Sequence, residues 1–140
     1  AIRVRQRATP AVAAPILFVL LIVLMVKYGS TKFLFTGDME VAAENDMLDY
    51  WADMGTFDVD VLKVGHHGSD TSTGYRFLYE VDPDYAVIPV GKDNSYGHPH
   101  EETLERLGQY GTKIFSTVDS GEITLKVYKR KVKIKQYKTE

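Results

Sequence analysis

The chain has 140 residues, of which 44% are hydrophobic and 26% are charged. That length holds one hydrophobic core and is too short for two ordinary domains, so a single globular unit is expected. The formal net charge of -2 gives no global argument for an anionic partner. Because the chain has no cysteine, disulfides and thiolate metal sites are excluded, and any metal must be held by histidine, carboxylate or water.

The amino-terminal region combines basic residues with a long apolar run. Arginines stand at positions 3, 5 and 7, and residues 16–26 are apolar without interruption. Such a segment resembles a signal peptide or an anchor, but no small-residue cleavage site follows Val26, and a bilayer span needs roughly 20 apolar residues. The preferred interpretation is a buried strand over residues 19–27, joined by a Gly-containing turn to a second strand over residues 31–36.

Residues 39–54 show helical periodicity, and Gly55 follows them as a stop signal. Their apolar stripe consists of Ala43, Met47, Trp51 and Met54. Asp38 precedes this helix and is open to two interpretations, a helix N-cap or a functional carboxylate. Residues 38–60 hold eight acidic residues and no Lys or Arg, which indicates a solvated helix face and a poor surface for nucleic acid.

Two histidines follow a short apolar strand in the stretch VLKVGHHGSD. The strand covers residues 61–64 and breaks at Gly65, so that His66 and His67 stand on a glycine-flanked turn. Open α/β folds place ligands at the carboxyl ends of their strands, and imidazole is the commonest protein metal ligand. The alternative is a pair of surface histidines in a turn.

A second strand ends in the same way. Residues 31–38 read TKFLFTGD, an apolar strand followed by Gly37 and Asp38. Because one helix separates this strand from the histidine strand, the two strands are expected to be neighbours, with Asp38 and His66 at the same edge. A carboxylate beside imidazoles suits zinc, manganese or iron in a hydrolytic site.

The rest of the chain continues an α/β order and contains no internal repeats. Pro89 indicates an edge or irregular position for the strand that contains it. Phe77, Leu78 and Val81 are expected to face inward from their helix. The expected elements are a helix over 73–81, a strand over 85–90, a polar loop over 91–99, a helix over 100–109, a strand over 113–118, a turn over 119–121 and a final hairpin.

Three motifs together resemble a known family. The stretches FLFTGDME, VDVLKVGHHGSDTS and YAVIPVGKDNSYGHPHEETLERL resemble, in order and spacing, the second half of a metallo-β-lactamase-fold domain of the ComEC-like, competence DNA-uptake branch. The resemblance covers about residues 23–125. It implies half of an αββα sandwich, a mixed β-sheet with flanking helices, over residues 19–140. Residues 1–18 depart from the family pattern and form an atypical extension.

The resemblance also implies site residues. Asp38 matches the aspartate that bridges two metals, and His66 matches the histidine ligand that ends the next strand. His67 is expected to orient Asp38 or to contact a phosphate, and His98 to contact substrate or transfer a proton; for His98, a loop histidine resting against Tyr96 is the alternative. The catalytic set is therefore Asp38, His67 and His98.

Further residues are assigned to substrate and metal. Ser69, Lys92 and Asn94 are expected to bind an anionic substrate. The family's H-x-H-x-D-H motif has no counterpart upstream of Asp38, because the four histidines lie at positions 66, 67, 98 and 100. Zinc or manganese is therefore expected to bind this chain weakly or not at all, since a catalytic zinc normally keeps three protein ligands.

Two classes of function follow. The first is part of a metal-dependent hydrolase acting on phosphodiesters, namely single-stranded DNA during uptake, within the soluble part of a bacterial membrane protein. The second is a catalytically silent remnant that binds a protein or nucleic acid. Half a sandwich leaves an apolar sheet face, which predicts self-association or a missing segment. Residues 126–138 carry seven Lys or Arg, which suit either a phosphate backbone or a solvated edge hairpin.

Overall fold

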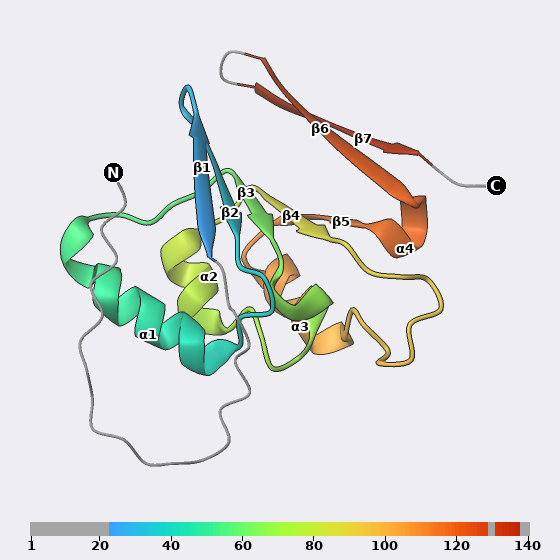
Figure 1. Ribbon diagram of the computed structural model, residues 1–140, viewed down its shortest axis with the longest axis horizontal. Helices are drawn as coiled ribbons and strands as arrows, with labels where there is room; N and C mark the ends of the chain where they lie inside the picture. Colours follow the sequence, from blue (N-terminus) through green and yellow to red (C-terminus); the bar gives the residue numbers. More distant parts are fainter. Residues whose placement is uncertain (1–22, 129–130, 138–140) are drawn as a thin grey trace.

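The computed structural model describes residues 23–128 and 131–137 and contains a five-stranded mixed sheet (Figure 1). Its spatial order is β1-β2-β3-β4-β5, with β1 antiparallel to β2 and the other neighbours parallel. The strands are β1 (Leu24–Tyr28), β2 (Thr31–Phe35), β3 (Val61–Lys63), β4 (Tyr85–Ile88) and β5 (Lys113–Ser116). The α/β class with a mixed sheet is therefore confirmed.

Three helices connect the parallel strands and lie on one face of the sheet (Figure 1), because parallel strands need crossover connections. They are α1 (Val41–Trp51), α2 (Tyr75–Val81) and α3 (Glu101–Gln109), and a short 3-10 turn, Ala52–Met54, extends α1. The core lies between these helices and the sheet. It includes Leu34, Leu62, Ala86 and Ile88 from the strands and Leu48, Phe77, Leu78, Val81 and Leu107 from the helices.

One acidic residue of α1 is buried in this core. Glu44 is 1% exposed, and its carboxylate accepts hydrogen bonds from the backbone N–H groups of Thr73, at 2.5 Å, and Gly74, at 2.8 Å. These donors stand at the start of α2, where helical N–H groups lack partners. Burial raises the pKa of Glu44, and the two hydrogen bonds oppose that rise. The prediction of a wholly solvated acidic face is wrong at this position.

The first strand differs from its prediction in burial. The turn to β2 is confirmed, with Tyr28 paired to Thr31 and Gly29 at a φ of +62°. However, β1 is exposed rather than buried, and within the described part of the chain it stands at the edge of the sheet: Leu24 is 45% exposed, and Phe35 opposite it is 42% exposed. An apolar strand is buried only where other elements cover the faces of the sheet to which its side chains point, and its own composition does not reveal that cover. Residues 19–22 lie outside the described residues.

Two later strands are shorter than predicted. β4 ends at Ile88, and it is not an edge strand, because β3 and β5 pair with its two sides; Pro89 stands just beyond the ladder, where its missing N–H is not needed. β5 ends at Ser116, whose hydroxyl accepts a hydrogen bond from the Val118 N–H at 3.2 Å. This cap starts the one-turn helix α4 (Thr117–Ser120) in place of the predicted strand end and turn.

A separate hairpin follows α4. Its strands β6 (Glu122–Tyr128) and β7 (Lys131–Tyr137) pair antiparallel and form their own two-stranded sheet. Figure 1 shows this hairpin extending from α4 on the side of the main sheet away from the three helices. Among the described residues, none of the helices is both long and apolar enough to span a bilayer.

The buried carboxylate generates a stability prediction. Glu44→Ala leaves two buried N–H groups without acceptors, and each such group costs about 1–3 kcal/mol, so the free energy of unfolding should fall by roughly 2–6 kcal/mol. Urea denaturation measures this. Asp46→Ala, an exposed acid on the same helix, is the matched control and should change stability by less than about 0.5 kcal/mol. Equal effects of the two substitutions would refute the structural role of Glu44.

Candidate functional site at the carboxyl edge of the sheet

Backbone hydrogen bonds join the turns that follow β2 and β3. The His66 N–H donates to the Gly37 carbonyl at 3.1 Å, and the Thr36 hydroxyl donates to the Lys63 carbonyl at 3.0 Å. Asp38 and His66 therefore stand at the same edge of the sheet, as the strand-glycine-ligand pattern predicts. Asp38 is not a helix cap, because α1 has Glu40 at its N-cap position.

The histidine turn has an unusual backbone. His66 and His67 adopt φ values of +44° and +53°, a left-handed backbone conformation that residues other than glycine rarely adopt. The flanking glycines allow close approach on both sides. A Cβ on Gly65 would lie 2.8 Å from the Met39 carbonyl oxygen, and one on Gly68 would lie 2.7 Å from Pro99. Such strain is maintained by packing and gathers at functional sites.

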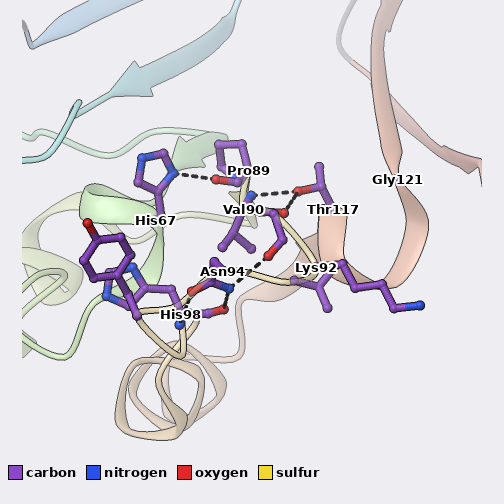
Figure 2. A pocket seen from close by; sticks show the side chains of 11 residues that line it. His67, Pro89, Val90, Lys92, Asn94, His98, Thr117 and Gly121 are labelled. Carbon is purple, nitrogen blue, oxygen red and sulfur yellow. Dashed lines mark hydrogen bonds between the residues drawn. The ribbon is translucent and has the colours of Figure 1, made fainter.

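His67 lies between a carbonyl and a carboxylate. Its Nδ1 is 2.6 Å from the Pro89 carbonyl oxygen (Figure 2), and its Nε2 is 3.6 Å from Asp38 Oδ1. A carbonyl only accepts, so Nδ1 carries the proton, and in the neutral ring the Nε2 lone pair faces the carboxylate. A nitrogen lone pair and a carboxylate oxygen at this separation are both able to coordinate one metal ion.

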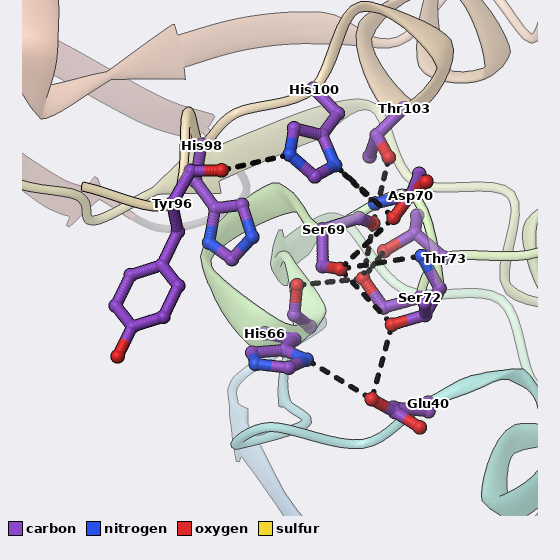
Figure 3. Close-up of polar contacts among 12 residues, drawn as sticks. Glu40, His66, Ser69, Asp70, Ser72, Thr73, Tyr96, His98, His100 and Thr103 are labelled. Atoms are coloured by element: carbon purple, nitrogen blue, oxygen red, sulfur yellow. Dashed lines mark hydrogen bonds and ion pairs between the residues drawn. The ribbon is translucent and has the colours of Figure 1, made fainter. Parts of the chain in front are cut away.

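His66 has different neighbours. Its Nδ1 is 3.3 Å from Glu40 Oε1 (Figure 3) but makes no hydrogen bond of good geometry. The Nδ1 atom is shielded from solvent, whereas the ring as a whole is partly exposed. Its ring packs edge-on against His98, with 5.5 Å between centroids. The structure thus places His67, rather than His66, beside Asp38. The metal-ligand roles of Asp38 and His66 remain predictions.

The loop over residues 91–99 is held by one side chain. Asn94 donates from Nδ2 to the carbonyls of Gly91, at 2.9 Å, and His98, at 2.7 Å, and its Oδ1 accepts from the His98 N–H at 2.9 Å (Figure 2). The Tyr96 ring stacks on the His98 ring with 5.7 Å between centroids. The loop is therefore ordered by its own contacts, and Asn94 has an architectural task besides its predicted role in binding substrate.

A cleft of about 610 Å³ opens beside these residues. The predicted site residues that line it are His67, Lys92, Asn94 and His98, and Tyr96 and Thr117 add to its wall (Figure 2). Ser69 is absent from its lining. That side chain is buried, and its hydroxyl lies 3.0 Å from the Thr71 hydroxyl within the same turn (Figure 3), so the structure does not bring Ser69 to the cleft.

The protonation of His98 is shifted by its surroundings. Burial lowers the pKa of His98, and the neighbouring imidazoles of His100, His66 and His67 lower it further. At neutral pH its ring is therefore uncharged and carries a free electron pair. Such a ring at the wall of a cleft is suited to accept a proton or to receive a hydrogen bond from a substrate.

Two residues missed by the sequence analysis position this loop. His100 Nε2 lies 3.0 Å from the Tyr96 carbonyl, and its Nδ1 lies 3.1 Å from both the backbone nitrogen and Oδ1 of Asp70 (Figure 3). Neutral His100 accepts from the Asp70 N–H, and protonated His100 donates to the Asp70 carboxylate. The Tyr96 carbonyl and Asp70 raise the pKa of His100, and His100 lowers that of Asp70. A histidine at a predicted helix start was the available signal.

The chemistry of these donors fits a metal, but their number does not complete a site. Residues 23–128 and 131–137 contain no group of three or more histidine and acidic side chains placed to hold a metal ion. The donors that lie together are the Asp38 carboxylate, His67 beside it and His66 nearby. A tight site needs at least one further protein ligand.

Comparison with known proteins identifies relatives. Residues 21–92 match the family model described as the metallo-beta-lactamase superfamily. The chain is 36% identical over 111 residues to ComE operon protein 3 of Bacillus subtilis, 36% identical over 118 residues to Recombination protein 2 of Haemophilus influenzae, and 38% identical over 101 residues to Competence protein ComA of Neisseria gonorrhoeae. These matches cover 79%, 84% and 72% of this chain and 14% of each relative. They confirm the resemblance drawn from the three motifs.

The His100–Asp70 pair predicts a pH-dependent stability. The raised pKa of His100 gives stability that is present below its ordinary value of 6.5 and is lost as pH rises through the folded value. The lowered pKa of Asp70 gives stability present above its ordinary value of 3.8 and lost as pH falls through the folded value. Urea denaturation should therefore show a larger loss for His100→Gln at about pH 5.5 than at about pH 8.5.

His98→Gln serves as the control for this measurement. Because the pKa of His98 is lowered, its unfolded form binds protons more readily, and the contribution of its ionisation to stability rises with pH. The two substitutions should therefore change with pH in opposite directions. A pH-independent loss for His100→Gln would contradict the ionic pairing with Asp70.

Proposed function

The chain belongs to the metallo-beta-lactamase superfamily, and from this premise we propose that it is part of a metal-dependent hydrolase of phosphodiesters, with DNA as substrate. The observation that carries the proposal is the convergence of Asp38, His66, His67 and His98 at one sheet edge, two of them on the wall of a cleft. The relatives named for competence and recombination support nucleic acid as the substrate class.

The proposed metal site is shared between this chain and a segment outside it. Asp38 and His67 face each other across 3.6 Å and supply two donors, with His66 as a third candidate. The remaining ligands come from elsewhere in a longer protein, because the chain spans only 14% of the length of its relatives. Zinc or manganese bound there would supply a hydroxide near neutral pH and positive charge for a phosphoryl oxygen.

The chain's own residues then have separate tasks. The Pro89 carbonyl fixes the tautomer of His67, so that Nε2 points to Asp38. His98, uncharged at neutral pH because its pKa is lowered, accepts or relays a proton at the cleft wall. Lys92 lines the same cleft and has no hydrogen bond or ion pair to another described residue, so its ammonium group is available to a substrate phosphate.

The open sheet face supports a covering segment. Leu24, Val26 and Phe35 are exposed on one face at the β1 edge, and contiguous apolar surface of this kind marks an interface. In this proposal, the first half of the same domain covers that face in the longer protein, and the isolated chain covers it by self-association. Sedimentation of the isolated chain should show oligomers that Phe35→Lys weakens.

A second candidate is a binding module without hydrolytic activity. The observation in its favour is that the described residues contain no complete group of metal ligands. Under this candidate the histidine turn and the cleft bind nucleic acid or a partner protein, and no substitution there alters any hydrolysis.

Hydrolysis of labelled single-stranded DNA by the intact gene product, supplied with manganese or zinc, tests the proposal. Asp38→Asn and His67→Asn should each reduce kcat/KM at least about 100-fold, because each removes a ligand. Asp93→Asn, the same chemical change at an exposed loop position, should leave the rate unchanged. Full activity in the Asp38→Asn variant would contradict the proposal, and DNA binding without any hydrolysis would favour the second candidate.

The isolated 140-residue chain gives a complementary prediction. Two protein ligands leave most coordination positions of a zinc ion to water. Calorimetric titration should therefore show only weak zinc binding, and the isolated chain should not hydrolyse phosphodiesters. A tight, stoichiometric zinc complex of this chain would show that the missing ligands are supplied by the chain or by a second copy of it.

A further inference from the structure

The β6–β7 hairpin has two faces of opposite character. Successive residues of a strand point to opposite sides, and the pairing register aligns the two strands residue by residue. One face carries the partly buried residues Ile123, Leu125, Val127, Val132 and Ile134. The other, here called the lysine face, carries Glu122, Thr124, Lys126, Tyr128, Lys131, Lys133, Lys135 and Tyr137, of which all but Thr124 are exposed.

The lysines of the lysine face make no close ion pair within the described part of the protein, although Asp60 and Asp84 line a pocket together with Lys131 and Lys133. Lys126 stands directly opposite Lys133 in the ladder, and like charges in that position are destabilising. Lys131 and Lys135 flank Lys133 on the same side of β7. No ion pair joins these four lysines to a carboxylate of the described residues, and the nearest acid in the ladder, Glu122, accepts a hydrogen bond from Thr124. An external polyanion would relieve this repulsion.

The same face combines cations with exposed aromatic rings. A groove of about 430 Å³ is lined by Lys126, Tyr128, Lys131, Lys133 and Lys135. Tyr128 is 57% exposed and Tyr137 is 46% exposed, and the Lys133 ammonium lies 6.0 Å from the centre of the Tyr128 ring. Alternate residues of a strand lie about 7 Å apart, a spacing comparable with that of successive phosphates in an extended single strand.

Protection of a sheet edge accounts for some of these residues but not for all. Lysines along an exposed strand discourage pairing with other chains. Edge protection does not require two lysines to stand opposite each other, nor two exposed tyrosines among them. Cationic grooves with stacking platforms are instead typical of surfaces that bind single strands without sequence preference.

The hairpin also adjoins the cleft. Gly121, the residue directly before β6, lines the cleft that contains His67 and His98. The α4 end of the hairpin therefore lies beside the cleft. We propose that the lysine face binds the backbone of single-stranded nucleic acid, with bases stacking on Tyr128 and Tyr137. This binding needs neither metal nor hydrolysis, so it goes beyond the function proposed above.

Fluorescence anisotropy of the 140-residue chain with a labelled oligothymidylate, in the presence of EDTA, tests the proposal. Contact with about three phosphates gives a slope near -2 for log K against log salt concentration, since each contact with a single strand contributes about 0.7. Lys133→Gln should weaken binding and reduce that slope by about 0.7. Lys27→Gln, which removes an exposed strand lysine outside the hairpin, should change neither.

A charge reversal separates binding from folding. Lys126→Glu replaces a like-charged pair with an oppositely charged one, so at low salt the variant should be at least as stable as the parent chain while binding the oligonucleotide more weakly. Tyr128→Leu should weaken binding with little change in the salt slope, whereas Tyr79→Leu, at an exposed tyrosine on α2, should not.

Three outcomes would overturn the proposal. They are unchanged affinity in Lys126→Glu, a salt slope unaffected by Lys133→Gln, and binding to phosphatidylglycerol vesicles without binding to the oligonucleotide. Because the assay contains EDTA and measures no hydrolysis, failure here leaves the hydrolase proposal standing, and failure of hydrolysis leaves the lysine face standing.

Discussion

The hydrogen bonds from the N–H groups of Thr73 and Gly74 to the buried Glu44 carboxyl group stabilise the segment that supports the candidate site. They fix the segment over residues 69–74 to α1, and that segment in turn supports the histidine turn. The Ser72 hydroxyl donates to the Gly65 carbonyl at 2.8 Å, and the Thr103 hydroxyl of α3 donates to the Ser69 carbonyl at 2.8 Å. The Glu44 carboxyl group of α1 and the Thr103 hydroxyl of α3 thereby tie two helices to the segment that supports the imidazoles.

Acidic and basic residues are concentrated in different parts of the structure. The net charge of -2 conceals two regions of opposite sign, an acidic stretch through α1 and a cationic hairpin at the other end of the described chain. A polyanion approaching this molecule is repelled by one side and attracted by the other. The hairpin adjoins the cleft through Gly121, so this polarity favours approach from the side where the predicted chemistry lies.

Features set by residues that are close together in the sequence were predictable, whereas features that depend on contacts between distant residues were not. The edge shared by Asp38 and His66 was predictable, because a strand that ends in glycine and then a ligand places that ligand by local geometry. The preference for His67 beside Asp38 was not, since it depends on left-handed backbone angles at both histidines. Glu44 was also missed, because its partners lie about thirty residues away and its neighbours in sequence are solvated acids.

The burial of β1 and the internal hydrogen bonds of the 91–99 loop could not be predicted from composition, for related reasons. β1 reads as a core strand by composition, but in the described structure only β2 pairs with it, and its cover depends on chain or partners that composition does not reveal. The loop over residues 91–99 is predicted as a polar loop, but its composition does not show that a single amide, Asn94, makes the hydrogen bonds that order it. Such many-bonded side chains are visible only in three dimensions.

The left-handed backbone conformation of His66 and His67 determines which substitutions at these positions can be interpreted. Left-handed angles cost most residues roughly 1–2 kcal/mol each, while glycine and asparagine accept them more readily. Replacement by valine or isoleucine would therefore remove the imidazole and destabilise the turn at once, and the resulting phenotype would not separate the two effects. Asparagine and glycine are the informative substitutions, and a saturation scan should rank the amino acids at these two positions by conformational tolerance before it ranks them by chemistry.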